Sequence, residues 1–395
     1  MRVLIAPDKF KGSLAATAVA EAMAGGVAAA VPRAEIVLCP MADGGDGTVE
    51  TVLASTTAEE RRAVVRAPLP GGRVEARWAV LPAGTLSPST SRQGLDPGQP
   101  VALVEMAQAS GLTLIPEGRR DPMATGTWGT GDLVLEALDA GCGQVVVGVG
   151  GSGTVDGGCG MAVALGYRML DSGGRELPGD GASLRLIDSI DASGADPRLE
   201  NARLLVATDV DNPLLGENGA ARVFGPQKGA GPEQVEALEA GLANLSEVIE
   251  RELGVSVSEL PGAGAAGGLG AGLVAFCGAG VVSGFELVAR AVRLEEKVAG
   301  CDLVLTGEGS FDTQSVHGKT PWGVARIASG HGVPSVIVAG RLEGHGPGAV
   351  PDGVATYCVL DGPMGLEEAM RDAAAQVRAG TARLMRLLGL SIERE

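Results

Sequence analysis

The chain has 395 residues, 45% of them hydrophobic and 20% charged, which is ample for a large core and more than one compact domain usually holds. Its 31 basic and 48 acidic residues give a formal net charge of −17, and it contains only three Trp, two Tyr and five Phe. A nucleic-acid partner is therefore disfavoured, because counterion release needs a basic face and base stacking needs aromatic side chains.

The N-terminal region predicts alternating strands and helices. An apolar run at 2–6 predicts a buried strand, and Ser13 is a suitable N-cap for an Ala-rich helix that reaches about Val31. After this helix, a second strand is expected at 34–39. A glycine turn and a helix that begins near Thr48 follow it.

The middle of the chain has a different pattern. Residues 64–80 resemble two strands joined by a Pro-Gly-Gly turn, so antiparallel pairing is expected there, and 87–100 is predicted to be a loop. Further strands are predicted at 101–106, 144–150 and 202–208, and helices at 130–140, 158–170 and 232–253.

A plain alternation of strands and helices returns after Phe285. Strands are predicted at 301–306, 334–340 and 354–360, and a terminal helix at 364–388. Because the two ends share one pattern and the middle differs, we expect an α/β protein with one parallel-sheet domain built from both termini and one inserted mixed α/β domain. The predicted domains are 1–62 with 285–395, and 63–284.

Two stretches bear on location. The first apolar run ends at Ala6 and charges follow at once, so no signal peptide is predicted and a cytoplasmic location is expected. No residue from Leu260 to Phe285 is charged, which is long enough to span a bilayer. That stretch opens with PGAGAAGGLGAG, however, and so much glycine favours a packed helix or Gly-rich loop. No membrane partner is expected.

Six cysteines lie far apart and form no C-x-x-C pair, which is typical of small buried hydrophobes in a reducing compartment. The three histidines, at 317, 331 and 345, offer no metal-ligand spacing with the cysteines, so a zinc site is disfavoured.

The 63 glycines gather in turns after strands, and in open parallel sheets ligands bind at those ends of the strands.

The turn APDKFKGSLAA at 6–16 places Asp8, Lys9 and Lys11 where the first strand ends. We expect it to handle a phosphate or a carboxylate, with Lys11 reaching over the N-terminus of the helix capped by Ser13, where free amides and the helix dipole favour an anion. The alternative is a solvated turn with two ordinary surface lysines.

The stretch GVGGSGTVDGGCG at 148–160 contains the G-x-G-x-x-G pattern of dinucleotide-binding folds. That fold also needs a helix, a second strand and an acid about twenty residues on. Residues 158–170 are too few to supply both elements before Asp171, so the pattern gives that reading little support. Backbone amides that cradle an anion, with Ser152 and Asp156 nearby, fit as well, and so does a purely structural glycine turn.

Two further turns carry carboxylates. PMADGGDGT at 40–48 places Asp43 and Asp46 around two glycines at a strand end, where a carboxylate can hold Mg²⁺, accept a proton or bond hydroxyls, although helix capping explains Asp46 as well. GEGSFDTQSVHGKTP at 307–321 gathers acids, amides and Lys319 in one turn. Its GKT is not a Walker A ending, because position 313 is threonine and Pro321 follows at once.

The span 208–232 is long and without predicted structure, and such loops are usually functional or disordered. Asp209, Asp211 and Asn212 could bind a metal or hydroxyls, and Lys228 could contact a phosphate. Asp-Asn-Pro is also an ordinary turn former.

In order, the motifs APDKFKGSL, PMADGGDGT, GGSGTVDGG, DVDNPLLGENGAARVFGPQKGA, PGAGAAGGLGAGL and GEGSFDTQSVHGKTPWGVA resemble the bacterial glycerate kinase type I family from residue 5 to beyond residue 320. The resemblance implies ATP-dependent phosphorylation of D-glycerate, usually to 2-phosphoglycerate, with Mg²⁺. It also implies two α/β domains, one of them Rossmann-like, with the active site in the cleft between them.

Residues within the matched motifs are assigned roles from their chemistry. Asp43 and Asp312 are the leading candidates for the base, since each lies in a glycine-flanked turn after a strand, and Lys11 is the third catalytic candidate. The residues expected to bind substrate or phosphate are Asp8, Gly12, Ser13, Gly44, Gly45, Gly150, Gly151, Ser152, Asp156, Lys228, Glu308, Gln314, Ser315 and Lys319, and Asp209 and Asn212 are expected to bind Mg²⁺. Lys9 stands where the family often has serine, and it is given no role.

The expected partners are therefore D-glycerate and ATP, and a homo-oligomer is possible. Two rival functions remain. A nicotinamide-dependent hydroxy-acid dehydrogenase rests on the single glycine pattern, and a metabolite-binding regulator would use the same scaffold without catalysis.

Overall fold

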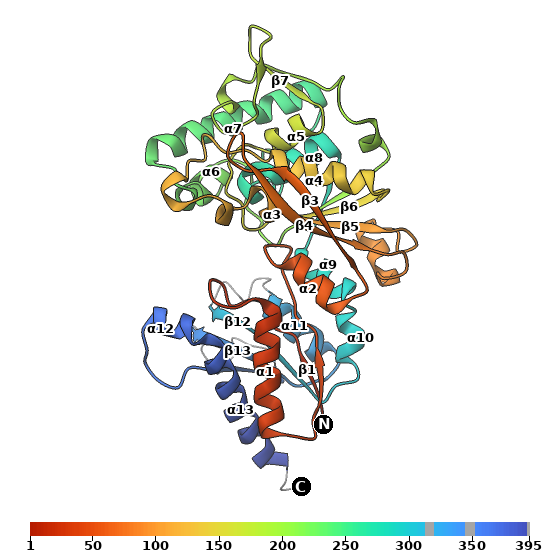
Figure 1. The fold of residues 1–395 in the computed structure, drawn as a ribbon, viewed down its shortest axis with the longest axis vertical. Coiled ribbons are helices and arrows are strands. Elements are labelled where there is room, and N and C mark those ends of the chain that lie inside the picture. Colours follow the sequence, from red (N-terminus) through yellow and green to blue (C-terminus); the bar gives the residue numbers. More distant parts are fainter. Residues whose placement is uncertain (313–319, 344–351, 393–395) are drawn as a thin grey trace. The chain divides into compact units, whose positions relative to one another are not determined.

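The computed structural model describes residues 1–312, 320–343 and 352–392 (Figure 1). Its strands are β1 (Arg2–Ile5), β2 (Glu35–Leu38), β3 (Glu59–Arg66), β4 (Arg73–Leu81), β5 (Val101–Glu105), β6 (Gln144–Gly148), β7 (Arg168–Leu170), β8 (Glu176–Leu177), β9 (Ser189–Asp191), β10 (Arg203–Ala207), β11 (Gly280–Val282), β12 (Leu303–Phe311), β13 (Ser335–Leu342) and β14 (Val354–Cys358).

The α-helices are α1 (Ala16–Ala30), α2 (Thr48–Ser55), α3 (Ala107–Ser110), α4 (Trp128–Asp139), α5 (Cys159–Ala164), α6 (Ala220–Phe224), α7 (Pro232–Leu253), α8 (Ala265–Cys277), α9 (Gly284–Ala291), α10 (Leu294–Val298), α11 (Thr320–Gly330), α12 (Leu366–Arg371) and α13 (Ala373–Ile392). Short 3₁₀ helices are η1 (Pro88–Gln93), η2 (Leu112–Leu114), η3 (Glu117–Arg119), η4 (Leu184–Leu186), η5 (Pro197–Glu200) and η6 (Pro226–Lys228).

The chain divides into two compact units. The first unit contains residues 1–43, 50–56 and 285–395, and the second contains 44–49 and 57–284. The boundary predicted after residue 62 falls inside β3, all of which pairs with β4 in the second unit. The short segment 44–49 also belongs to the second unit, so the chain passes from one unit to the other between Asp43 and Gly44.

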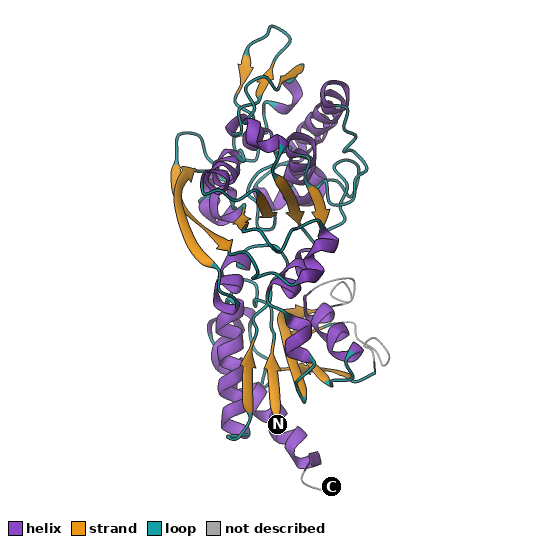
Figure 2. Cartoon of the chain, turned by 90° about the vertical axis from the view of Figure 1, so that its right-hand side faces the viewer, coloured by secondary structure: helices purple, strands orange, loops and turns teal. Residues whose placement is uncertain are grey.

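The first unit is built on a five-stranded sheet with the order β14-β13-β12-β1-β2, and every neighbouring pair is parallel (Figure 2). Strands from the two ends of the chain meet at its centre, where Leu4 pairs with Val304. Helix α1 packs against α13, and a Cβ on Gly26 would lie 2.5 Å from the carbonyl oxygen of Arg378. The prediction of a parallel sheet built from both termini is confirmed.

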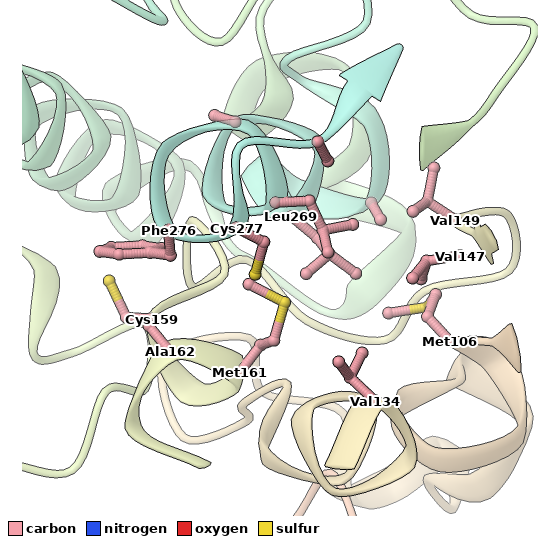
Figure 3. Close-up of a cluster of buried hydrophobic side chains, with 14 of the residues drawn as sticks. Met106, Val134, Val147, Val149, Cys159, Met161, Ala162, Leu269, Phe276 and Cys277 are labelled. Carbon is pink, nitrogen blue, oxygen red and sulfur yellow. The ribbon is translucent and has the colours of Figure 1, made fainter. Parts of the chain in front are cut away.

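The second unit is mixed α/β, as predicted. Its six-stranded sheet has the order β11-β10-β6-β5-β4-β3. The β3–β4 hairpin and the β4–β5 pair are antiparallel, whereas β5, β6, β10 and β11 are parallel. A separate antiparallel sheet joins β8, β7 and β9. The main core lies around the parallel strands, and Figure 3 shows side chains from four elements that meet in it: Val134, Val147, Cys159, Met161, Leu269 and Cys277.

The glycine-rich segment that begins at Leu260 forms buried structure. Its helix α8 contains three consecutive left-handed residues, Ala266, Gly267 and Gly268, and it packs against the loop that follows β6. Among the residues that the structure describes, no helix is both long and apolar enough to cross a membrane. All six cysteines lie in the described part of the chain as free thiols, and five of them are buried as expected.

Some elements differ from their predictions. Residues 158–170 hold the short helix α5 and the strand β7, because the chain turns at Gly166, whose φ of +98° is left-handed. The predicted terminal helix is two helices, α12 and α13, and the span 208–232 contains α6 and η6. Strand β12 continues to Phe311, so Glu308 lies in the strand and not in a turn after it.

Candidate functional site

The carboxyl edge of the sheet in the first unit gathers Asp8, Lys9 and Asp43. Asp8 and Lys9 follow β1, and Asp43 follows β2, the neighbouring parallel strand. The backbone N–H of Asp8 donates to the carbonyl of Gly307 in β12 at 2.8 Å, which anchors the first turn to the sheet. Nζ of Lys9 lies 3.4 Å from Oδ1 of Asp43, and both side chains are partly exposed. Neighbouring parallel strands thus bring Asp43 beside Asp8 and Lys9, although Lys9 and Asp43 are 34 residues apart in sequence.

Asp8 is the buried member of this group, with 8% of its surface exposed. Its Oδ1 accepts a hydrogen bond from the backbone N–H of Lys9 at 2.7 Å. Burial, reinforced by the negative charge of Asp43, raises the pKa of Asp8 to about 6, and the Lys9 charge opposes this shift. The two carboxylates therefore repel each other, and Lys9 offsets part of that repulsion.

Glu308 and Asp312 belong to the same edge of the sheet. Glu308 is half-buried in β12, one residue after the Gly307 carbonyl that binds Asp8, and the half-buried Asp312 directly follows that strand. A Cβ on Gly309 would lie 3.4 Å from the backbone nitrogen of Lys11, so the first turn lies against this strand. Gln314, Ser315 and Lys319 lie outside the described residues.

The sequence-based reading of the first turn needs correction. Helix α1 begins at Ala16 without a side-chain cap, and the Ser13 hydroxyl donates to the carbonyl of Phe10 at 3.1 Å inside a tight turn. Ser13 is therefore not the N-cap of α1. Lys11 is exposed, and α1 begins only at Ala16. Gly12 has a left-handed φ of +80°, which accounts for glycine there. Lys9, which was given no role, is the lysine beside Asp43.

At the carboxyl edge of the sheet in the second unit, the loop after β6 packs by its backbone. The segment that begins at Gly44 lies against the loop after β6, and only glycine fits at their contacts. A Cβ on Gly148 would lie 2.3 Å from the carbonyl oxygen of Gly44, and one on Gly150 would lie 2.5 Å from Cα of Gly45. Gly151, like Gly44, has a left-handed φ. These glycines are therefore explained by close packing of two chain segments.

Glu105, which sequence reasoning missed, fixes the same segment. It is 1% exposed at the end of β5, and its carboxylate accepts hydrogen bonds from the backbone N–H groups of Gly47, at 3.2 Å, and Val49. It thus satisfies donors at the start of α2. Burial raises its pKa to about 6, while the two amides oppose the shift. A charged residue that ends an otherwise apolar strand was the available signal.

Lys228 and Asp156 lie buried beneath the loop after β6. Nζ of Lys228 donates to Oγ of Ser152 and to the carbonyl of Thr154, both at 2.7 Å. Asp156 accepts four hydrogen bonds, from the amide and hydroxyl of Thr127 and from the amides of Gly158 and Gly160. Burial raises the pKa of Asp156, and these donors oppose the shift. Asp156 is thus a structural anchor, and Lys228 reaches the loop itself.

Each of the two expected metal ligands bonds a neighbouring group in the structure. Oδ1 of Asp209 accepts a hydrogen bond from the Ser283 hydroxyl at 2.7 Å, and the Asn212 amide donates to the carbonyl of Asn218 at 2.9 Å. Across residues 1–312, 320–343 and 352–392, no three His, Cys, Asp or Glu side chains form a group that could hold a metal ion.

The dinucleotide reading is also resolved by topology. The argument that 158–170 cannot hold a helix and a strand is wrong, since α5 and β7 both form there. Strand β7, however, pairs with β8 and β9 in the separate small sheet and not with β6. The next strand that pairs in parallel with β6 is β10 (Arg203–Ala207), which lies well beyond the βαβ unit of about 30 residues that the fingerprint requires.

Comparisons with known proteins agree with this arrangement of motifs. The model of the glycerate kinase family matches residues 3–389. The chain is 45% identical over 374 residues to a protein named glycerate 2-kinase from Escherichia coli strain K12, covering 94% of each chain. It is 45% identical over 371 residues to a glycerate kinase of Halalkalibacterium halodurans, covering 93% of each.

A crystal structure described as glycerate kinase 2 from Salmonella typhimurium LT2 is 41% identical, with a TM-score of 0.79, and the match covers 100% of this chain and 99% of that one. With a family match over nearly the whole length and relatives at this level of identity, the chain belongs to the glycerate kinase family.

Proposed function

We propose that this protein transfers the γ-phosphoryl group of ATP to the 2-hydroxyl group of D-glycerate, giving 2-phospho-D-glycerate and ADP. Membership of the glycerate kinase family supports an ATP-dependent phosphotransferase, and the name of the Escherichia coli relative supports the 2-position. The observation that carries the proposal is the group of Asp8, Lys9 and Asp43 at one edge of a parallel sheet, where ligands of open α/β sheets bind.

Asp43 is the proposed proton acceptor. It is the more exposed of the two paired carboxylates, so a substrate hydroxyl can reach it. As the glycerate oxygen bonds to the γ-phosphorus, the bond from that phosphorus to the β–γ bridging oxygen breaks, ADP leaves, and the hydroxyl proton passes to Asp43. Lys9 holds the carboxylate in place and adds positive charge beside the phosphates. Asp312 is the alternative acceptor on the same edge.

The glycine-rich loops of the second unit are proposed to hold anionic oxygens. Gly148 and Gly150 bring their backbone close to Gly44 and Gly45, and Ser152 adds a half-buried hydroxyl two residues later. Backbone amides and hydroxyls are neutral donors to phosphate or carboxylate, so they suit a protein with 17 excess negative charges.

Mg²⁺ is proposed to enter with ATP. It usually keeps several waters and takes only one or two protein carboxylates together with phosphate oxygens, so a three-residue group is not required. Asp8 would hold it, because its buried carboxylate lies beside the charge of Asp43 at the sheet edge, and a divalent cation offsets both charges. The ion would neutralise charge on the phosphoryl group.

The test is direct. Recombinant protein with ATP, Mg²⁺ and D-glycerate should release ADP, and ³¹P NMR of the product should show 2-phosphoglycerate. The 3-isomer would correct the position, and turnover of another hydroxy acid alone would correct the substrate. Reduction of NAD⁺ with glycerate would support the dehydrogenase, and glycerate binding without ADP release would support the regulator. A cytoplasmic location and a homo-oligomer stay predictions.

A further inference from the structure

Lys228 is almost fully buried, with 1% of its surface exposed, at the end of η6 in the second unit. A lysine is rarely buried to this degree unless its ammonium group is hydrogen-bonded. Here Nζ donates to Oγ of Ser152 and to the backbone carbonyl of Thr154, each at 2.7 Å. Its ammonium group therefore binds the loop after β6, and its burial keeps it from direct contact with a ligand.

In the hydrogen bond between Lys228 and Ser152, only the lysine can be the donor. An ammonium group carries three donors and no acceptor, so the serine oxygen must accept. The hydrogen of the serine hydroxyl is then free to donate elsewhere. Ser152 is half-buried, and it follows Gly150 and Gly151 at the carboxyl edge of the sheet. The lysine therefore turns this hydroxyl into a donor at the place where ligands bind in such sheets.

The surroundings hold the loop in this arrangement. The N–H of Gly157 donates to the carbonyl of Gly267 at 3.1 Å. A Cβ on Gly267 would lie 2.1 Å from the carbonyl oxygen of Thr154, the second acceptor of Lys228. The left-handed segment of α8 thus packs directly on the loop that carries Ser152, and it includes Ala266, an uncommon residue for that conformation. A strained backbone segment of α8 is thus held against the loop that carries Ser152.

We propose that Lys228 is a positioning residue that fixes the Ser152 hydroxyl as a hydrogen-bond donor to an anionic oxygen of a substrate, either the carboxylate of glycerate or a phosphate of ATP. This inference rests on the proposed function, and it replaces the direct phosphate contact expected for Lys228 from sequence. Burial lowers the pKa of Lys228 to about 7, with the Asp156 charge opposing the shift, so the charged form is present at and below neutral pH.

The test uses Ser152→Ala, Lys228→Met and the double variant, with titration calorimetry of D-glycerate and of ATP measured separately at pH 6.5. Because a hydrogen bond to a charged group is lost, each single variant should weaken one of these ligands about 10- to 100-fold. The double variant should be no weaker than the singles, since both changes remove the same donor. Ser152→Thr, which keeps a hydroxyl, should stay near wild type.

Gln144→Met is the matched structural control. Gln144 is also buried, at the opposite end of β6, and it exchanges two hydrogen bonds with the backbone of Asp96, at 2.6 and 2.9 Å. Its replacement should lower the melting temperature without changing either affinity. A purely structural role for Lys228 would make Lys228→Met behave like this control.

The outcomes separate the alternatives. Weaker D-glycerate binding identifies the carboxylate as the acceptor, and weaker ATP binding identifies a phosphate. The inference is overturned if Ser152→Ala binds both ligands as the wild type does, or if the two single effects multiply in the double variant. Because serine is small and half-buried, the Ser152 variants test the inference even if Lys228→Met does not fold. A wild type that binds D-glycerate without turning it over would refute the proposed function instead.

Discussion

The turn after β1 in the first unit and the loop after β6 in the second lie at the same kind of sheet edge but differ in chemistry. In the first unit, ionisable side chains reach the edge, and Asp43 and Lys9 are partly exposed there. In the second, the loop after β6 presents glycine backbone and a serine hydroxyl, while the charged groups Lys228 and Asp156 are buried beneath this loop and bonded to it. The proposed function assigns these two edges a division of labour, in which the first moves the proton and the second holds anionic oxygens.

The largest effect is expected at the first edge. Asp43→Asn keeps the shape but cannot accept a proton, so kcat should fall about 10²- to 10⁴-fold with little change in KM. Asp312→Asn is the companion variant, at the end of β12, which is separated from β2 by β1 in the same sheet. Steady-state kinetics of both decide between them: a large loss only in Asp312→Asn would move the base to that residue, and normal turnover in both would exclude both.

At the sheet edge of the second unit, added side-chain volume should lower activity most. Gly148→Ala puts a Cβ 2.3 Å from the Gly44 carbonyl, so the two loops must separate, and we expect kcat/KM to fall at least about 10-fold. Gly143, just before the same strand, has no atom within 4 Å of a Cβ position and no left-handed φ. Gly143→Ala should therefore match the wild type in kinetics and melting temperature. Equal effects of the two substitutions would contradict the packing argument.

The two lysines of the first turn form a natural pair. Lys9→Met removes the cation beside Asp43, and we expect about a 10-fold loss in kcat/KM, consistent with a partly exposed charge. Lys11→Met should lose less, because Lys11 is exposed and helix α1 begins only at Ala16. A loss near 100-fold for Lys11 would support the catalytic role expected for it from sequence.

A smaller, local effect is expected at Glu105. Glu105→Ala removes the acceptor for the Gly47 and Val49 amides, so their hydrogen exchange should speed up about 10-fold while the sheet amides stay protected. Glu136→Ala, on the exposed side of α4, is the control. If exchange at Gly47 and Val49 does not change, Glu105 does not hold the segment.

The buried lysine also predicts a pH trend in stability. The pKa of Lys228 falls from 10.5 to about 7 on folding, so the unfolded chain binds more protons between these values and the free energy of unfolding rises with pH across that window. Lys228→Met lacks this contribution. The melting temperature of the wild type relative to Lys228→Met should therefore increase from pH 7 to pH 9, and a constant difference would mean that folding does not lower the pKa of Lys228.

Much of the fold could be predicted because strands in parallel sheets are continuous apolar runs. The runs around β1, β6, β10 and β13 have that character, and the helix predicted at 232–253 matches α7 in both ends. The misses have local causes. Apolar spacing alone does not distinguish α5 from β7 within 158–170, and a good capping residue such as Ser13 can bond its own turn instead.

The candidate sites were harder to predict, because side-chain partners depend on tertiary contacts. Asp8 and Asp43 could be chosen from their positions after strands, but nothing local pairs Lys9 with Asp43. Likewise, a lysine in a Gly-rich loop suggests a phosphate contact, and only packing shows that Lys228 is buried. Glu105 was overlooked because it stands inside a strand pattern.

The division of labour is tested most directly by one kinetic comparison of Asp43→Asn and Ser152→Ala, with kcat and both KM values measured for D-glycerate and ATP. We predict that Asp43→Asn lowers kcat at least about 100-fold with KM values near wild type, whereas Ser152→Ala raises one KM about 10-fold or more with a smaller change in kcat. If Asp43→Asn acts mainly on KM, or Ser152→Ala mainly on kcat, the two edges do not divide chemistry from binding in this way.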